Sequence, residues 1–160
     1  MNSQEIVVGI ADYKVAKAPV VLSTNLGSCI AVCLYSSLHK AGSMLHIILP
    51  DSSSGINKDG IKTAKFADTG IPEMFNKLQQ VCGVGINDCV AKLFGGAKIL
   101  QQVSNNIGQA NEIAARAVLK QLGIRVVAAK TGGEKGYRVK FDLITGKVQC
   151  QIFGEEIMEY

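Results

Sequence analysis

Two short apolar segments separated by a turn constrain the fold of this chain more than any other feature. Residues 30–35 and 44–49 are each six residues long and rich in residue types that favour β-structure. Apolar runs of this length predict buried strands. The residues between them, from His39 to Gly42, predict a turn, so we expect the two segments to pair as a hairpin.

A thiol and an imidazole lie where this hairpin would bring them together. Cys29 follows Gly27 and Ser28 where a loop becomes the first strand, and the second strand carries His46 back toward that loop. A neighbouring imidazole can take the proton of a thiol and so produce the reactive thiolate. Gly27 permits a positive φ or a close approach to a ligand, and free N–H groups in such a turn can stabilise an oxyanion. We therefore predict Cys29 as a nucleophile, His46 as its base, and Gly27 and Ser28 as an oxyanion-binding turn.

The same residues leave alternatives open. A third group should orient the imidazole, and Ser23 and Thr24 both offer a hydroxyl for this role. Cys29 is one of five cysteines, and a reduced cysteine often packs as a small apolar residue. His39 is a rival base, but it lies in the turn near Ser and Lys residues and is expected at the surface.

The remaining periodicity predicts a single α+β domain over residues 1–160. Helices are expected from Thr69, with Thr69 or Asp68 as its cap, to Val81, and from Asn111 to Leu122. Further short strands are expected at residues 6–10, 13–16, 20–23, 89–94, 124–129, 139–143 and 147–153. The helices should cover a largely antiparallel or mixed sheet. The acidic, partly apolar end of the chain is expected to fray or to take part in a partner contact.

Composition argues against several classes of protein. Seventeen Lys and Arg residues face 13 Asp and Glu without a block of like charge, and aromatic residues are few, so no nucleic-acid surface is expected. Cys29 and Cys33 would lie about 13 Å apart along a strand, too far to share a metal ion. No apolar run approaches the ~18 residues of a membrane helix, and the first residues lack the basic region of a signal peptide. We therefore expect a cytoplasmic protein without metal or membrane insertion.

A glycine-rich segment and a polar segment are expected near the Cys29 and His46 residues. Gly95 and Gly96 do not fit a phosphate-binding loop and instead predict a tight turn that lets the backbone approach the Cys29 loop. The polar run from Asp51 to Lys62 predicts a loop that either gates a substrate or is a solvated connection.

The residues around Cys29 resemble the signature of the CheD family, the chemoreceptor glutamine deamidases of bacterial and archaeal chemotaxis. The resemblance begins with residues 26–35, Leu45-His46 and Leu49-Pro50. It continues over nearly the whole chain through residues 66–72, 92–97, 107–111, 131–136 and 139–146.

This resemblance implies roles for individual residues. Cys29 matches the family's nucleophile and His46 its base. The third catalytic residue of the family is a threonine six positions before the cysteine, and Ser23 occupies that position here. Ser23 is therefore expected to orient His46, with Thr24 as the alternative if the register of the loop differs by one residue. The implied fold is a layered α/β/β sandwich, related in active-site architecture to the deamidating domain of cytotoxic necrotizing factor toxins.

The resemblance also implies a function. It predicts cofactor-free deamidation of receptor glutamines to glutamate, with release of ammonia through a thioester on Cys29. The expected partners are the cytoplasmic helices of chemoreceptors and a CheC-type phosphatase. One alternative is a weakly active or inactive adaptor that binds both partners, which the loss of threonine at Ser23 favours. The retained Cys29 and His46 speak against the adaptor, because a binding surface does not need them. Another alternative is a cysteine protease or acyltransferase that uses the same two residues.

Overall fold

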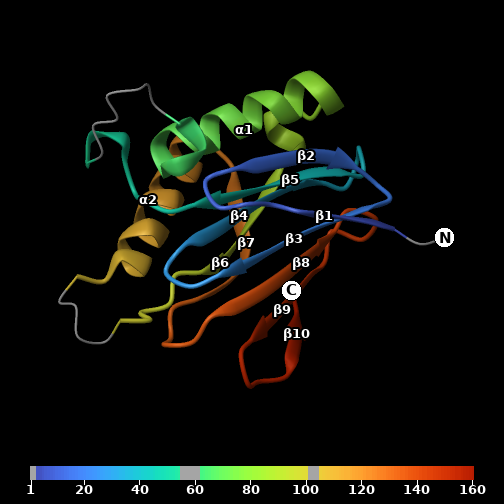
Figure 1. The fold of residues 1–160 in the computed structure, drawn as a ribbon. Coiled ribbons are helices and arrows are strands. Elements are labelled where there is room, and N and C mark those ends of the chain that lie inside the picture. Colours follow the sequence, from blue (N-terminus) through green and yellow to red (C-terminus); the bar gives the residue numbers. More distant parts are fainter. Residues whose placement is uncertain (1–2, 55–61, 101–104) are drawn as a thin grey trace.

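The architecture consists of two stacked five-stranded sheets with two helices on one outer face. The computed structural model describes residues 3–54, 62–100 and 105–160. The central sheet has the strand order β2-β5-β4-β6-β7, and the outer sheet has the order β1-β3-β8-β9-β10. Figure 1 shows α1 and α2 on the side of the central sheet that faces away from the outer sheet. The expected α/β/β layering is confirmed.

Both sheets are mixed. Within the central sheet β6 and β7 are parallel and the other neighbours antiparallel. Within the outer sheet β1 and β3 are parallel and the rest antiparallel. The strands of the central sheet are β2 (Tyr13–Lys17), β4 (Ile30–Ser36), β5 (Ala41–Ile47), β6 (Val90–Gly95) and β7 (Arg125–Thr131). Those of the outer sheet are β1 (Gln4–Val7), β3 (Val20–Leu26), β8 (Tyr137–Asp142), β9 (Val148–Ile152) and β10 (Ile157–Glu159).

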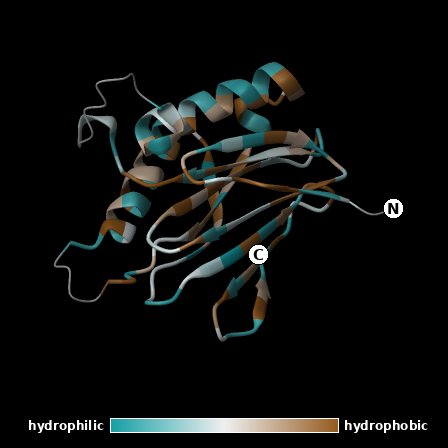
Figure 2. Ribbon diagram, in the orientation of Figure 1, coloured by the Kyte–Doolittle hydropathy of each residue, from teal (hydrophilic) through white to brown (hydrophobic). Residues whose placement is uncertain are grey.

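The burial of both faces of strand β4 explains why its sequence is apolar without interruption. Side chains alternate along a strand, and both faces of β4 are covered. Ile30, Val32 and Leu34 pack toward the helices. Ala31, Cys33 and Tyr35 pack into the core between the two sheets, which we call the inter-sheet core. In Figure 2 the side of α1 that faces away from the sheet is mostly hydrophilic, while the strands beneath carry hydrophobic segments.

Helix α1 (Ala67–Cys82) begins earlier than its sequence predicted. Neither predicted cap residue caps it: the Asp68 carboxylate accepts hydrogen bonds from the backbone and hydroxyl of Ser52, and the Thr69 hydroxyl donates to the carbonyl of Thr63. These contacts fasten the short 3-10 helices η1 (Ser52–Ser54) and η2 (Thr63–Lys65) to the helix. The helix ends at Cys82, one residue beyond the predicted Val81, and Gly83 caps it with a φ of +71°. The predicted loop from Asp51 to Lys62 lies in part, at residues 55–61, outside the described residues.

Helix α2 (Ile107–Leu122) also begins earlier, because Asn106 caps it by accepting a hydrogen bond from the backbone of Gln109 at 3.0 Å. The sequence predicts that Ile113, Ala114, Ala117, Val118 and Leu122 face the core, and Ala114, Val118 and Leu122 do pack against it. Asn111, Ala115 and Leu119 are fully buried, whereas Ile113 of the predicted face is exposed. A third short 3-10 helix, η3 (Ile86–Asp88), precedes β6.

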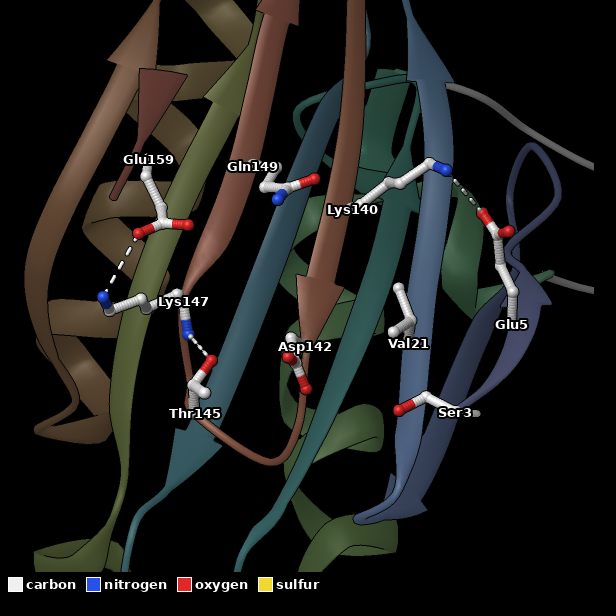
Figure 3. Close-up of a pocket in the computed structure, with 9 residues that line it drawn as sticks. All are labelled: Ser3, Glu5, Val21, Lys140, Asp142, Thr145, Lys147, Gln149 and Glu159. Carbon is white, nitrogen blue, oxygen red and sulfur yellow. Dashed lines mark hydrogen bonds and ion pairs between the residues drawn. The ribbon is translucent and has the colours of Figure 1, made fainter. Parts of the chain in front are cut away.

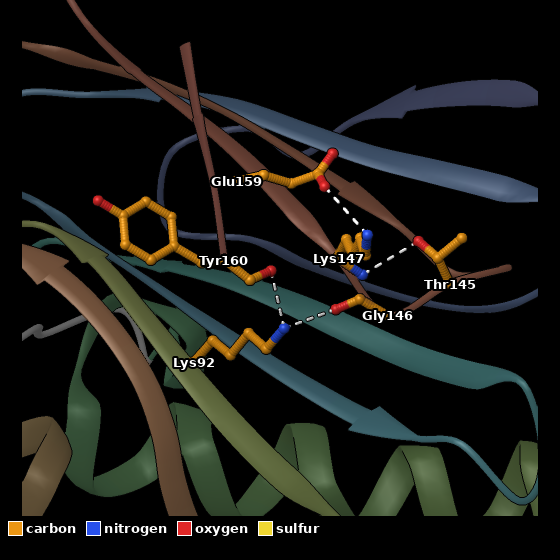
Figure 4. A network of polar contacts seen from close by, with 6 residues as sticks. All are labelled: Lys92, Thr145, Gly146, Lys147, Glu159 and Tyr160. Atoms are coloured by element: carbon orange, nitrogen blue, oxygen red, sulfur yellow. Dashed lines mark hydrogen bonds and ion pairs between the residues drawn. The ribbon is translucent and has the colours of Figure 1, made fainter.

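The last residues form an ordered edge rather than a frayed end. Strand β10 pairs with β9, and the Lys92 ammonium on β6 donates to the carbonyls of Gly146 at 2.8 Å and Tyr160 at 2.9 Å (Figure 4). Lys147 and Glu159 form an ion pair at 3.2 Å in the same network. One lysine of the central sheet thus holds two segments of the C-terminal region. In the described ranges, no helix is long and apolar enough to cross a membrane.

Candidate active site

Residues 27–29, which we call the Cys29 loop, cross from one sheet to the other. They leave β3 of the outer sheet and enter β4 of the central sheet. Cys29 is half-buried and packs against the inter-sheet core. Cys29 therefore lies at the edge of the space between the sheets and is partly exposed to solvent.

His46 lies on the same face of the central sheet as Cys29. It pairs with Ala31 across β4 and β5, and Ala31 faces the inter-sheet core. Because Cys29 is two residues before Ala31, alternation puts it on the same face and diagonally across from His46. His46 is 2% exposed, and its Nε2 atom has no hydrogen-bond partner in the part of the chain that the structure describes.

Thr24 on β3 orients this imidazole. Its hydroxyl oxygen lies 2.8 Å from Nδ1 of His46 and 2.9 Å from the carbonyl oxygen of Val8. A carbonyl can only accept, so the single hydroxyl proton goes to Val8 and the hydroxyl oxygen accepts from Nδ1–H. This assignment leaves the lone pair of Nε2 free, which is the tautomer that a general base needs.

Ser23 does not share this contact. It pairs with Val7 on one side and Lys140 on the other, and alternation turns its side chain away from the face that carries Thr24. The contact with His46 that the resemblance leads us to expect of Ser23 is therefore made by Thr24. The sequence held a signal for this choice: Leu22 and Leu26 are both buried, and period-two alternation groups Thr24, not Ser23, with them.

Every carbonyl of the Cys29 loop is held from outside the loop. The carbonyl of Gly27 accepts from the backbone of Ala97 at 3.0 Å, and that of Cys29 accepts from Gly96 at 2.8 Å. The carbonyl of Ser28 accepts from the side-chain amide of Asn111 at 3.2 Å. Within the described residues, the N–H groups of the loop make no hydrogen bond. They are therefore available as donors to an oxyanion.

The Gly95-Gly96 turn explains how another segment comes so close to this loop. Gly95 has a φ of +104°, and a Cβ atom there would lie 2.4 Å from the carbonyl oxygen of Cys29. The prediction of a glycine turn that lets the backbone approach the Cys29 loop is confirmed. Gly27, in contrast, does not have a positive φ, and a Cβ atom there would lie 3.3 Å from the Ile99 side chain.

Burial keeps both reactive groups neutral in this state. Desolvation raises the pKa of the Cys29 thiol. Desolvation also lowers the pKa of His46 from 6.5 to about 4. At neutral pH the site therefore holds a thiol and an uncharged imidazole that can accept its proton.

The other candidates lie elsewhere. His39 lies 3.9 Å from the carboxylate of Asp88 and is partly exposed, as expected of a surface residue. The described residues contain no group of three or more His, Cys, Asp or Glu side chains that could hold a metal ion.

A hollow of about 390 Å³ lies on the face of the outer sheet that points away from the inter-sheet core. Figure 3 shows its lining of paired charges, with Glu5 3.6 Å from Lys140. It faces away from the inter-sheet core and from Cys29, so it is not part of this site.

Two residues of this arrangement were not predicted from the sequence. Val8 supplies the carbonyl that receives the Thr24 proton, a backbone role that leaves no trace in residue identity. Asn111 supplies the amide that binds Ser28, and its place at the expected start of a helix concealed that role.

Comparison with known proteins identifies the family. The family model described as CheD chemotactic sensory transduction matches residues 48–152. A Desulforamulus reducens protein named probable chemoreceptor glutamine deamidase CheD is 42% identical over 98% of this chain and 95% of its own length. A Pyrococcus abyssi protein of the same name is 38% identical over 98% of both chains. A Thermotoga maritima protein named chemoreceptor glutamine deamidase CheD is 37% identical over 92% of both chains.

Structural comparison gives a more distant likeness. A crystal structure of a DUF152-family protein from Neisseria meningitidis aligns with a TM-score of 0.41 at 16% identity, covering 80% of this chain and 58% of that one. A TM-score this low carries no argument about function. The sequence relatives match nearly the whole chain, and the family model matches most of its length. These matches show that this chain belongs to the CheD family.

Proposed function

We propose that this protein is a chemoreceptor glutamine deamidase, an amidohydrolase that converts glutamine side chains of receptor proteins to glutamate. The observation that carries the proposal is the contact of Thr24 with Nδ1 of His46, which leaves Nε2 free on the face that also carries Cys29. The names of the relatives support the same reaction, and the alignments cover more than nine-tenths of those proteins.

The first half of the reaction forms a thioester. Nε2 of His46 takes the proton of Cys29 as the sulfur attacks the carboxamide carbon of the glutamine. Because the resting groups are neutral, proton transfer accompanies formation of the sulfur–carbon bond. The N–H groups of the Cys29 loop donate to the developing oxyanion. The protonated imidazole then gives its proton to the amide nitrogen, the carbon–nitrogen bond breaks, and ammonia leaves.

The second half restores the enzyme. Water gives a proton to Nε2 as its oxygen attacks the thioester carbon, and the same N–H groups stabilise the second oxyanion. The carbon–sulfur bond breaks, the sulfur recovers the proton from His46, and glutamate remains on the receptor. The net change is one amide and one water converted to one carboxylic acid and ammonia.

The adaptor alternative rested on the missing threonine at Ser23. Because Thr24 supplies the hydroxyl contact to His46, the serine no longer favours an inactive protein. A CheC-type phosphatase as partner and a cytoplasmic location stay predictions.

The test is to incubate the protein with a receptor cytoplasmic fragment and to measure ammonia release and the intact mass of the fragment, beside Cys29→Ala. We expect ammonia in equal amount to the glutamines converted to glutamate, and neither product with Cys29→Ala. Cleaved fragment would indicate a protease instead. Binding of the fragment by both proteins without any mass change would support the adaptor.

A further inference from the structure

Asn111 is a polar side chain in an apolar setting. It lies in the second turn of α2 and is 0% exposed, beside the buried Ala115 and Leu119 of the same face. Its Oδ1 atom is buried and has no partner within the described ranges. Packing alone does not require an amide here, because a buried acceptor without a partner is unfavourable.

The amide nitrogen has two partners. Nδ2 lies 3.2 Å from the carbonyl oxygen of Ser28 and 3.2 Å from that of Ile48. Both partners can only accept, so the NH₂ group must face them. Ser28 immediately precedes Cys29, and Ile48 is two residues beyond His46. One side chain therefore connects the segment that carries the thiol with the segment that carries the imidazole.

The contact with Ser28 also fixes the direction of an N–H group. In a planar trans peptide, the carbonyl of one residue and the N–H of the next point in opposite directions. Because Asn111 holds the Ser28 carbonyl toward α2, the N–H of Cys29 points away from α2. This N–H is the backbone donor nearest to the nucleophilic sulfur, and it makes no hydrogen bond within the described part of the chain.

The neighbouring peptides do not need a side chain for this purpose. The carbonyls of Gly27 and Cys29 are held by backbone N–H groups of Ala97 and Gly96. The Ser28–Cys29 peptide is thus the one peptide of the loop whose orientation depends on a side chain.

We propose that Asn111 is a positioning residue that orients the Cys29 N–H as the oxyanion donor. The role rests on the proposed cysteine chemistry, but it applies to any acyl transfer at Cys29. Without the amide, the Ser28–Cys29 peptide is free to rotate, and the donor no longer points at the oxyanion.

The decisive comparison uses two reactions of Cys29 that need no receptor. Acylation by p-nitrophenyl acetate passes through an oxyanion, whereas alkylation by iodoacetamide does not. In Asn111→Asp the side chain keeps its size but cannot donate to both carbonyls: an ionised carboxylate donates to neither, and a protonated carboxyl donates to only one. We expect its acylation rate to fall about a hundredfold, the size of effect that loss of one oxyanion donor has. Its alkylation rate should stay within about threefold, since the thiol and His46 remain in place.

Asn106→Asp is the matched control. It makes the same chemical change in the same helix, but Asn106 uses its oxygen to accept from Gln109, and a carboxylate keeps that bond. Both rates should equal those of the wild type. Asn111→Ser retains one donor and should lie between the wild type and Asn111→Asp, which guards against a variant that folds poorly.

Two outcomes would overturn the proposal: an acylation rate of Asn111→Asp equal to that of the wild type, or a parallel fall of the acylation and alkylation rates. With the receptor fragment, Asn111→Asp should lose kcat with little change in KM. If the wild type does not deamidate the fragment, the proposed function fails, and the ratio of the two rates still tests Asn111.

Discussion

At the scale of single residues, the site depends on which of two adjacent hydroxyls contacts His46. Thr24 bridges Nδ1 of His46 and the carbonyl of Val8, while Ser23 faces the other side of β3. The two hydroxyls are one residue apart and differ by a methyl group. Only strand alternation separates them, and that makes the assignment testable by matched substitutions.

We predict that Thr24→Val lowers kcat by about 10- to 100-fold, because the imidazole loses the acceptor that fixes its tautomer. The buried Nδ1–H would also lose its partner, at a cost of about 1–3 kcal/mol in the free energy of unfolding. Thr24→Ser should retain most of the activity. The measurements are steady-state deamidation of a receptor fragment and urea unfolding.

Ser23→Ala is the comparison that decides between the two positions. We expect kcat within about twofold of the wild type and a stability change within about 0.5 kcal/mol, as for substitutions away from buried networks. If Ser23→Ala loses activity and Thr24→Val keeps it, the orienting role belongs to Ser23.

At the scale of elements, the Gly95-Gly96 turn at the end of β6 supports the Cys29 loop. Gly95→Ala would put a Cβ atom 2.4 Å from the carbonyl oxygen of Cys29 at a φ of +104°. We predict a loss of at least about 2 kcal/mol in stability, from left-handed backbone strain and from displacement of the loop. Deamidation should fall with it, because the loop carries both the proposed nucleophile and the proposed oxyanion donors.

Gly123→Ala separates backbone strain from displacement of the loop. Gly123 has a φ of +80° but nothing within 4 Å of a Cβ atom, and it lies at the far end of α2. We expect a stability loss of about 1 kcal/mol from strain alone and unchanged kcat. Equal losses of activity in the two variants would contradict the role of Gly95 as support for the loop.

The sequence predicts the elements better than it predicts the contacts between them. The apolar run at 30–35 was found as β4, and that at 44–49 overlaps β5, which begins sooner because Gly42 lies inside the strand opposite Tyr35. The helix starts were predicted too late. At α1 the two predicted caps, Asp68 and Thr69, bind other segments, and at α2 the cap is Asn106, which lies before the predicted start at Asn111. Asn111 shows the limit: its partners are backbone carbonyls far away in the sequence, and no local pattern encodes them.

At the scale of the whole molecule, the two sheets confine an uncharged imidazole, and this links stability to pH. In the unfolded chain His46 has its ordinary pKa near 6.5, and burial lowers the folded value to about 4. Between these values the unfolded state binds a proton that the folded state does not bind. Stability therefore falls as pH decreases from about 6.5 to about 4, by roughly 3 kcal/mol if the whole difference is realised.

His46→Asn isolates this contribution from that of the carboxylates, which titrate in both proteins. The difference in unfolding free energy between pH 7 and pH 4.5, measured by urea, should be smaller in His46→Asn than in the wild type by about 2 kcal/mol. An equal difference in both proteins would mean that His46 titrates normally. Because protonation would also remove the proposed catalytic base, the acid limb of kcat should lie near pH 4 and not near 6.5. The same burial that makes the fold sensitive to acid thus keeps the base ready over the whole neutral range.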